Sequence, residues 1–167
     1  KVEVDKESGL NVLGFHDGTK SAYLWRSNKV ETIGSINPDF LGSVNTTLRY
    51  KNVALSVSLD ARFGGYVASY NGRYATAYGF SKTSLNYRDE AHGGATYTSR
   101  WDGLTYHDGV IPEGIFKTGT QIRQADNTLY TVGTGQYSTG ETFQELMDKG
   151  VVEPSHANTW TYWNNCW

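Results

Sequence analysis

One stretch of the chain, residues 40–63, alternates regularly between apolar and polar side chains. Successive side chains of a β-strand point to opposite faces, so a period of two predicts strands at residues 40–50 and 53–63. Their junction at Lys51-Asn52 predicts a tight β-hairpin, and this is the only long regular element that the pattern indicates. One face would hold Phe40, Gly42, Val44, Thr46, Leu48, Tyr50, Val53, Leu55, Val57, Leu59, Ala61 and Phe63.

Residues 1–38 carry scattered Gly, Asp, Asn and Ser with little periodicity, so we expect an irregular loop segment there, with a short strand end at residues 2–4. Asn37-Pro38-Asp39 ends this segment, because the residue before a proline is driven to extended geometry. Residues 74–90 favour one or two short helices that are interrupted near Gly79.

The C-terminal part of the chain holds further short patterns. Residues 109–114 read as an extended segment with a turn, and residues 121–132 as a small hairpin around Ala125-Asp126-Asn127. Thr142-Phe-Gln-Glu145 fits a capping box, which predicts a short helix ending at Gly150. We expect no closing element in the tail from Trp160 onward.

The chain therefore divides into a loop segment at 1–38, two strands with a short turn at 39–65, and a long loop region with short helices and a small hairpin at 66–167. Loops of that length are uncommon in a compact domain and are usually functional. The alternative interpretation is that the sequence is part of a larger chain.

Composition narrows the class of protein. A net charge of −2 over 167 residues gives no sign of a nucleic-acid partner. Cys166 is the one cysteine, which excludes an internal disulfide. No apolar run approaches the ~20 residues of a transmembrane helix, but a strand of a membrane barrel needs only about 9–11 residues.

The alternation alone does not say where the apolar face points. It fits a soluble sandwich with that face inward, and it fits a membrane barrel with that face toward lipid. A sandwich needs about seven strands, whereas one strong pair is found here. Arg49, Asp60 and Arg62 on the polar face suit a hydrated lumen, and Tyr50 and Phe63 stand where interfacial aromatic residues are expected.

No catalytic, cofactor or metal site is predicted, and we do not expect an enzyme. The four histidines have no ligand spacing. Asp102, Asp108 and Glu113 could form a glycosidase carboxylate pair, but surface loops are rich in such residues. Gly133-Thr-Gly135 lacks the strand-to-helix context of a phosphate loop.

Aromatic residues accumulate in the second half of the chain, and their flat apolar faces suit stacking on sugars or packing against a partner protein. The other interpretation is that they form a small core that holds the long loop together. The candidate contact residues are Tyr97, Trp101, Tyr106, Tyr130, Trp160 and Trp163, accompanied by Tyr137 and Tyr162.

Three motifs carry a resemblance to a known family. They are Ile33-Gly-Ser-Ile-Asn-Pro-Asp-Phe-Leu-Gly42, Asn45-Thr-Thr-Leu-Arg-Tyr-Lys-Asn52, and Leu55 through Asp60-Ala-Arg62-Phe-Gly-Gly65. In this order they closely resemble the late-barrel signature of the SusC/RagA family. Residues 72–88 and 109–114 are similar to the family's next extracellular segment, so the resemblance covers roughly residues 30–116.

The resemblance implies a TonB-dependent outer-membrane transporter of Bacteroidota-type bacteria that imports glycans or peptides, capped by a SusD-like surface lipoprotein. The family's fold is a β-barrel of about 22 strands around an N-terminal plug. The sequence shows no plug and no TonB box, so we expect a segment of such an all-β barrel, with TonB contacted through a missing N-terminal part. Residues 51–52 would be a periplasmic turn and the loops would be extracellular.

The resemblance also assigns the two faces of the hairpin. Lipid would cover Val44, Leu48, Leu55, Val57 and Leu59, whereas Asn45, Arg49, Asp60 and Arg62 would face the lumen. A second hypothesis, from another class, is a secreted all-β carbohydrate-binding module that uses the aromatic residues.

Overall fold

The computed structural model describes residues 1–164, and the chain is mostly β, with 37% in strands and 18% in helices. It divides into two compact units. The first combines Lys1–Val30 with the chain from Tyr70 onward, and the second is Glu31–Ser69. The long segments before and after the predicted hairpin therefore fold together as one unit.

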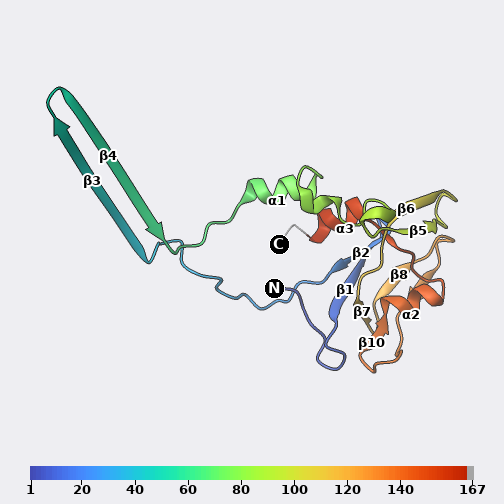
Figure 1. The fold of residues 1–167 in the computed structure, drawn as a ribbon. Helices are drawn as coiled ribbons and strands as arrows, with labels where there is room; N and C mark the ends of the chain where they lie inside the picture. The colour runs from blue at the N-terminus through green and yellow to red at the C-terminus, as the bar shows by residue number, and fades with distance from the viewer. Residues whose placement is uncertain (165–167) are drawn as a thin grey trace. The chain divides into compact units, whose positions relative to one another are not determined.

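The second unit is built on the predicted hairpin (Figure 1). Strands β3 (Phe40–Tyr50) and β4 (Val53–Phe63) pair antiparallel along their whole length, from Phe40 opposite Phe63 to Tyr50 opposite Val53. The two-residue turn holds Lys51 at a φ of 51°. The sequence prediction of the arms and of the turn is confirmed to the residue.

The first unit contains a four-stranded sheet in the order β10-β7-β1-β2. Its strands are β1 (Asn11–His16), β2 (Ser21–Leu24), β7 (Gly114–Lys117) and β10 (Gly140–Thr142). Strand β1 pairs antiparallel with β2 and parallel with β7, and β10 pairs antiparallel with β7.

The expectation of an irregular loop over residues 1–38 was therefore wrong for β1 and β2. Val12 and Leu13 are both buried, at 3% and 2% exposed, although adjacent strand residues point to opposite faces. A strand covered on both faces shows no alternation, so a search for period two does not find it. The expected strand end at residues 2–4 is confirmed by bridges from Val2 to Arg26 and from Val4 to Asn11.

Two smaller sheets complete the strands. A three-stranded sheet has the order β11-β6-β5, formed by β11 (Ser155–His156), β6 (Thr105–Val110) and β5 (Ala95–Thr98). Strands β8 (Gln121–Arg123) and β9 (Leu129–Thr131) form the small hairpin that the sequence predicts. The extended segment with a turn also agrees, since β6 ends at Val110 and β7 begins at Gly114.

The helices are short. Helix α1 (Tyr70–Ala77) starts four residues before the predicted helical region, and the predicted break follows it at Gly79, where φ is 85°. Two 3-10 turns follow, η1 (Lys82–Leu85) and η2 (Glu90–His92). Helix α2 (Phe143–Asp148) begins with the predicted capping box, in which Thr142 and Glu145 bond each other's backbone N–H.

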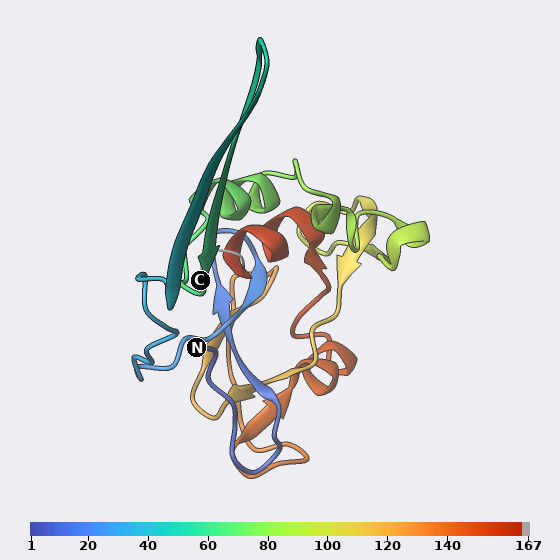
Figure 2. The same ribbon diagram turned by 60° about the vertical axis from the view of Figure 1, so that its left-hand side comes forward.

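The expectation that the tail has no closing element was wrong for its described part. Helix α3 (Ala157–Asn164) includes Trp160 and lies beside α1 (Figure 2). Its aromatic and Asn/Thr residues have modest helix propensity, so the sequence signal is weak. Residues 165–167 lie outside the described part of the chain.

One apolar core holds the first unit together. Phe116 and Phe143 are fully buried at its centre, with ring centroids 6.2 Å apart. Tyr130 and Trp160 pack against this core. Each fully buried large side chain contributes about 1.5–3 kcal/mol to the free energy of folding. The segments expected to be loops therefore form a hydrophobic core of their own. The core consists of Leu13, Ala22, Phe116, Ile122, Val132, Phe143, Leu146, Val151 and Val152.

Side chains from the C-terminal part cover the outer edge of β2. The Ala22 N–H donates to Ser155 Oγ at 3.0 Å, and the Leu24 N–H donates to Asn164 Oδ1 at 2.8 Å. An uncovered strand edge presents unpaired backbone groups that can pair with another chain. These two bonds close that edge with residues more than 130 positions away.

Candidate functional site: a two-faced hairpin and exposed aromatic residues

The hairpin exposes a long apolar surface. Residues directly opposite each other in an antiparallel pair share a face, and Val44 is paired with Leu59 and Leu48 with Leu55. These four side chains are 57–65% exposed. Soluble monomers rarely expose apolar patches of more than a few hundred Å², so this face is suited to contact with an apolar environment. The large apolar side chains on it are Phe40, Val44, Leu48, Tyr50, Val53, Leu55, Val57, Leu59 and Phe63.

The opposite face is polar and internally bonded. Ser58 Oγ donates to Asn45 Oδ1 at 2.5 Å, and the hydroxyls of Thr47 and Ser56 are 3.1 Å apart. The register puts all four residues that were predicted to face a lumen on this one side, namely Asn45, Arg49, Asp60 and Arg62. The separation of apolar and polar faces expected from the sequence is thus present in the paired strands.

Aromatic residues stand at both ends of the apolar face. The rings of Phe40 and Phe63 lie 6.0 Å apart at the open end, and Lys51 Nζ lies 5.3 Å from the Tyr50 ring at the turn. Ten residue steps at about 3.3 Å separate the two ends by roughly 33 Å. At a strand tilt of about 40° this spans about 25 Å, the height of the apolar band of a membrane barrel.

Backbone hydrogen bonds between the flanking segments hold together the end of the hairpin opposite the turn. The Asp39 N–H donates to Phe63 O at 3.0 Å, and the Tyr66 N–H donates to Ser35 O at 2.9 Å. Gly64 has a φ of 74°, which other residues rarely adopt, and a Cβ there would meet the Asp39 carboxylate. The Asp39 and Gly64 positions of the sequence motifs therefore depend on each other sterically.

Two of the predicted aromatic contact residues form a small group with a histidine. The rings of Tyr97 and Tyr106 are 5.8 Å apart, and the Tyr106 ring is 4.4 Å from that of His156. Tyr106 donates its hydroxyl to Asp102 at 2.6 Å, which lowers the pKa of that carboxyl. Burial raises the pKa of Tyr97. Asp102 and Asp108, considered above as catalytic carboxylates, thus lie against Tyr106 and His156.

The other predicted contact residues lie elsewhere. Lys20 Nζ sits 4.2 Å from the ring of Trp101. Tyr130 and Trp160 pack against the core, as the alternative interpretation of the aromatic residues expected. The ring of Trp163 lies beside that of His16, with centroids 4.6 Å apart and the two planes tilted by 32°. The predicted set is therefore divided among several places in the first unit.

Trp163 belongs to a continuous series of rings, which we call the aromatic row: Tyr74, Tyr78, Tyr162, Trp163, Tyr23 and Trp25. Successive ring centroids in this order lie 6.0, 6.2, 5.5, 6.4 and 5.9 Å apart. Sequence reasoning missed Tyr74 and Tyr78, whose spacing of four places them on one face of α1. It also missed Tyr23 and Trp25, whose spacing of two places them on one side of an extended segment.

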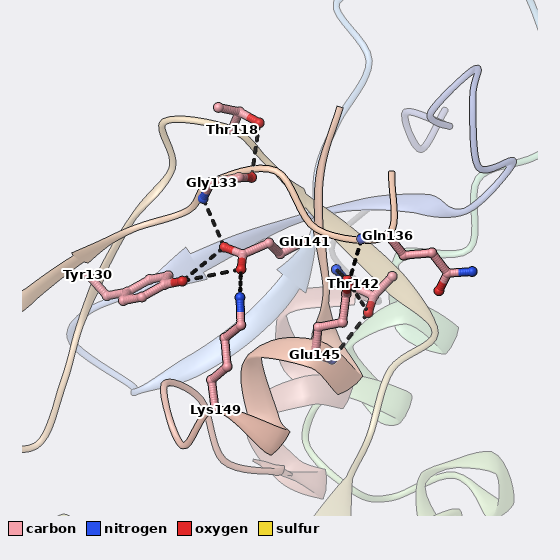
Figure 3. Close-up of polar contacts among 8 residues, drawn as sticks. All are labelled: Thr118, Tyr130, Gly133, Gln136, Glu141, Thr142, Glu145 and Lys149. Carbon is pink, nitrogen blue, oxygen red and sulfur yellow. Dashed lines mark hydrogen bonds and ion pairs between the residues drawn. The ribbon is translucent and has the colours of Figure 1, made fainter. Parts of the chain in front are cut away.

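A buried carboxylate fixes the loop before α2 (Figure 3). Glu141 is 1% exposed and accepts the Gly133 N–H at 2.8 Å, the Tyr130 hydroxyl at 3.2 Å and the Lys149 ammonium. Burial raises the pKa of Glu141, but these three donors outweigh burial and hold that pKa below its usual value. The contacts of Glu141 link β9, β10 and the end of α2, which is a structural role.

Neighbouring Glu145 closes the same region. Its carboxylate accepts the Gln136 N–H and the Thr142 N–H, both at 2.7 Å (Figure 3). These bonds lower the pKa of Glu145. Both glutamates therefore hold the segment 133–142, which ends in β10, against α2.

Within residues 1–164 no group of three or more His, Cys, Asp or Glu side chains is arranged to hold a metal ion. Across the same residues, no helix has the length and hydropathy needed to cross a membrane. Comparisons with protein-family models, with curated proteins and with solved structures found no match.

Proposed function

We propose that this chain is a segment of a TonB-dependent outer-membrane transporter of the SusC/RagA type, in which β3 and β4 are adjacent membrane-crossing strands. Such a transporter imports glycans or peptides together with a SusD-like surface lipoprotein. The observation that carries the proposal is the hairpin of two eleven-residue strands, which has an exposed aliphatic face, aromatic residues at both ends, and a polar opposite face.

The unpaired edges of the hairpin support the proposal. Among the described residues, β3 and β4 form a sheet of two strands and have no further neighbour. A lone hairpin is marginally stable in water, and free edges invite pairing. A barrel would supply a strand at each edge, lipid would cover Val57 and its neighbours, and water in the lumen would solvate Arg49 and Asp60.

Loop lengths support an orientation. In outer-membrane barrels the periplasmic turns are short and the extracellular loops are long. The two-residue turn at Lys51-Asn52 would then be periplasmic, and the first unit would be extracellular, where substrate and lipoprotein arrive. Its exposed aromatic residues suit either contact.

Cysteine labelling tests this orientation. On a Cys166→Ser background, Leu104→Cys places a thiol at an exposed site of the first unit, and Lys51→Cys places one in the turn. In the full transporter, a membrane-impermeant maleimide should label Leu104→Cys on intact cells, and Lys51→Cys only after the outer membrane is permeabilised. Equal labelling of both cysteines on intact cells would contradict the proposal.

A second candidate is a secreted carbohydrate-binding module. It is favoured by one observation, the buried core and sheets of the first unit. A module of this kind should be secreted into the medium and remain a soluble monomer with cooperative thermal unfolding. Recovery of the chain in the outer-membrane fraction would exclude it.

A further inference from the structure

A groove in the first unit lies beside the aromatic row. It has a volume of about 390 Å³ and lies where α1 and α3 approach each other. Small-molecule sites have volumes of roughly 300–1,000 Å³ and combine apolar walls with a few polar groups. Its lining includes Tyr78, Arg88, Asn158, Tyr162 and Trp163.

The aromatic row extends beyond this groove, and four of its six residues are exposed to solvent. Trp25, Tyr74, Tyr78 and Tyr162 are 45%, 49%, 61% and 40% exposed. Neighbouring ring planes in the row are tilted by 15° to 85°, so each exposed ring offers a separate stacking face to the sugar rings of an oligosaccharide. Flat aromatic faces with a polar edge suit stacking on such rings.

Gly14 makes part of the row possible. A Cβ at this position would come within 3 Å of the Tyr23 hydroxyl and of the Trp25 ring. Because glycine has no side chain, both rings can lie against the backbone of β1. The positions of the Tyr23 and Trp25 rings therefore depend on the glycine in β1.

Charge adds a second requirement on the ligand. Arg88 is the one charged residue that lines the groove among the described residues, and its Nη2 donates to Asn158 Oδ1 at 3.2 Å. That bond uses one of five guanidinium N–H donors, and the planar fork suits a carboxylate. A site with aromatic faces and one guanidinium matches a sugar ring that carries an acid group.

The neighbouring strand edge argues against an extended peptide. Peptides commonly bind by adding a strand to a free sheet edge. Here the Ala22 and Leu24 N–H groups on the outer edge of β2 already donate to Ser155 and Asn164. The backbone donors that a peptide would use next to the groove are therefore occupied.

We propose that this groove binds an acidic oligosaccharide, with sugar rings stacked on the aromatic row and a uronate carboxylate paired with Arg88. The biological role of this binding rests on the proposed function, which makes the first unit extracellular. Binding itself is a property of the groove and does not depend on where the hairpin lies.

Calorimetric titration of the full chain in detergent tests this inference. The probes are tri-galacturonate, its fully methyl-esterified form, which keeps the rings but removes the charges, and tri-alanine. We expect measurable binding of the acid, weaker binding of the ester and none of the peptide. Preferential binding of tri-alanine, or equal affinity for acid and ester, would overturn the inference.

Three variants connect binding to the groove. Arg88→Gln should weaken tri-galacturonate binding about ten- to hundredfold and leave the ester unaffected. Tyr78→Ala should weaken both sugars about three- to tenfold. Lys82→Gln, an exposed cation outside the groove, is the matched control and should change neither.

Arg88→Lys guards against a folding artefact, because it keeps the charge but loses the planar fork, and it should give an intermediate affinity. Affinity unchanged in Arg88→Gln would overturn the assignment of Arg88. Absence of sugar binding by a chain with native circular dichroism would overturn the inference and leave the labelling test of the hairpin unaffected.

Discussion

Val44 and Leu59 lie opposite each other in the middle of the β3–β4 hairpin, and each is almost two-thirds exposed, at 64% and 65%. An aliphatic cross-strand pair this exposed indicates a surface made for an apolar environment. On the opposite face the Asn45–Ser58 pair is joined by a side-chain hydrogen bond. The hairpin is therefore the element whose surroundings the proposed function must explain.

Arginine substitutions on the two faces should have unequal effects. Val57→Arg places a charge on the lipid face near the middle of the strand and should cost about 2–4 kcal/mol of folding free energy. Ser58 follows Val57 in the chain and lies on the polar face, so Ser58→Arg should be tolerated far better. The fraction of heat-modifiable folded barrel, measured for each variant in the full transporter, tests both expectations, and equal losses would refute the assignment of the faces.

Gly14→Ala should destabilise the first unit by about 1–3 kcal/mol, because the new methyl group meets the Tyr23 and Trp25 rings. Gly133→Ala is the matched control, since a Cβ at Gly133 meets nothing within 4 Å. Thermal unfolding measures the loss of stability, and near-ultraviolet circular dichroism should report moved rings only in Gly14→Ala. A melting temperature equally changed in both variants would rule out the steric explanation.

The pH dependence of stability should depend on Glu141. Its folded-state pKa lies below the usual value of 4.5, so the unfolded state binds more protons, and the stabilisation is lost as pH falls through the folded pKa. Glu141→Gln should lower stability at neutral pH and reduce the loss between about pH 5 and pH 3. Chemical denaturation across this pH range measures the free energy of unfolding, and Glu113→Gln, at an exposed position, is the control. If the free energy of unfolding of Glu141→Gln fell with pH as steeply as that of the unchanged protein, the assigned role of Glu141 would be contradicted.

Ser155→Ala should expose the edge of β2. Ser155 is 1% exposed and accepts the Ala22 N–H, so its loss leaves a buried donor unpaired at a cost of about 1–3 kcal/mol. Hydrogen exchange should accelerate at Ala22. Ser138→Ala, which removes a hydroxyl bonded to Glu7, is the control and should leave exchange at Ala22 unchanged. Unchanged Ala22 exchange in Ser155→Ala would show that the bond does not protect the edge.

The parts of the fold that the sequence predicted are those with local signals. The alternation from Phe40 to Phe63 defined β3 and β4, and the Thr142–Glu145 capping box defined the start of α2. Strand β1 could not be predicted in this way, because Val12 and Leu13 are covered on both faces by elements distant in the sequence.

The same distinction holds for the candidate sites. The polar face was predictable because Asn45 and Asp60 belong to one alternating hairpin. Of the aromatic row, the sequence singled out only Trp163, with Tyr162 as an accompanying residue. The other four rings were missed because the contacts of the row join α1, α3 and the segment around β2. Arg88 was likewise invisible as a ligand-binding candidate, since its groove forms only when these segments pack.

The most direct test of the proposed function is the environment of adjacent residues in the hairpin. An environment-sensitive fluorophore would be attached to Val57→Cys or Ser58→Cys on a Cys166→Ser background, with the full transporter in bilayers of brominated lipid. We expect a blue-shifted emission that is strongly quenched by the lipid at position 57, and a water-like emission with little quenching at position 58. Water-like, unquenched emission at both positions would contradict the account.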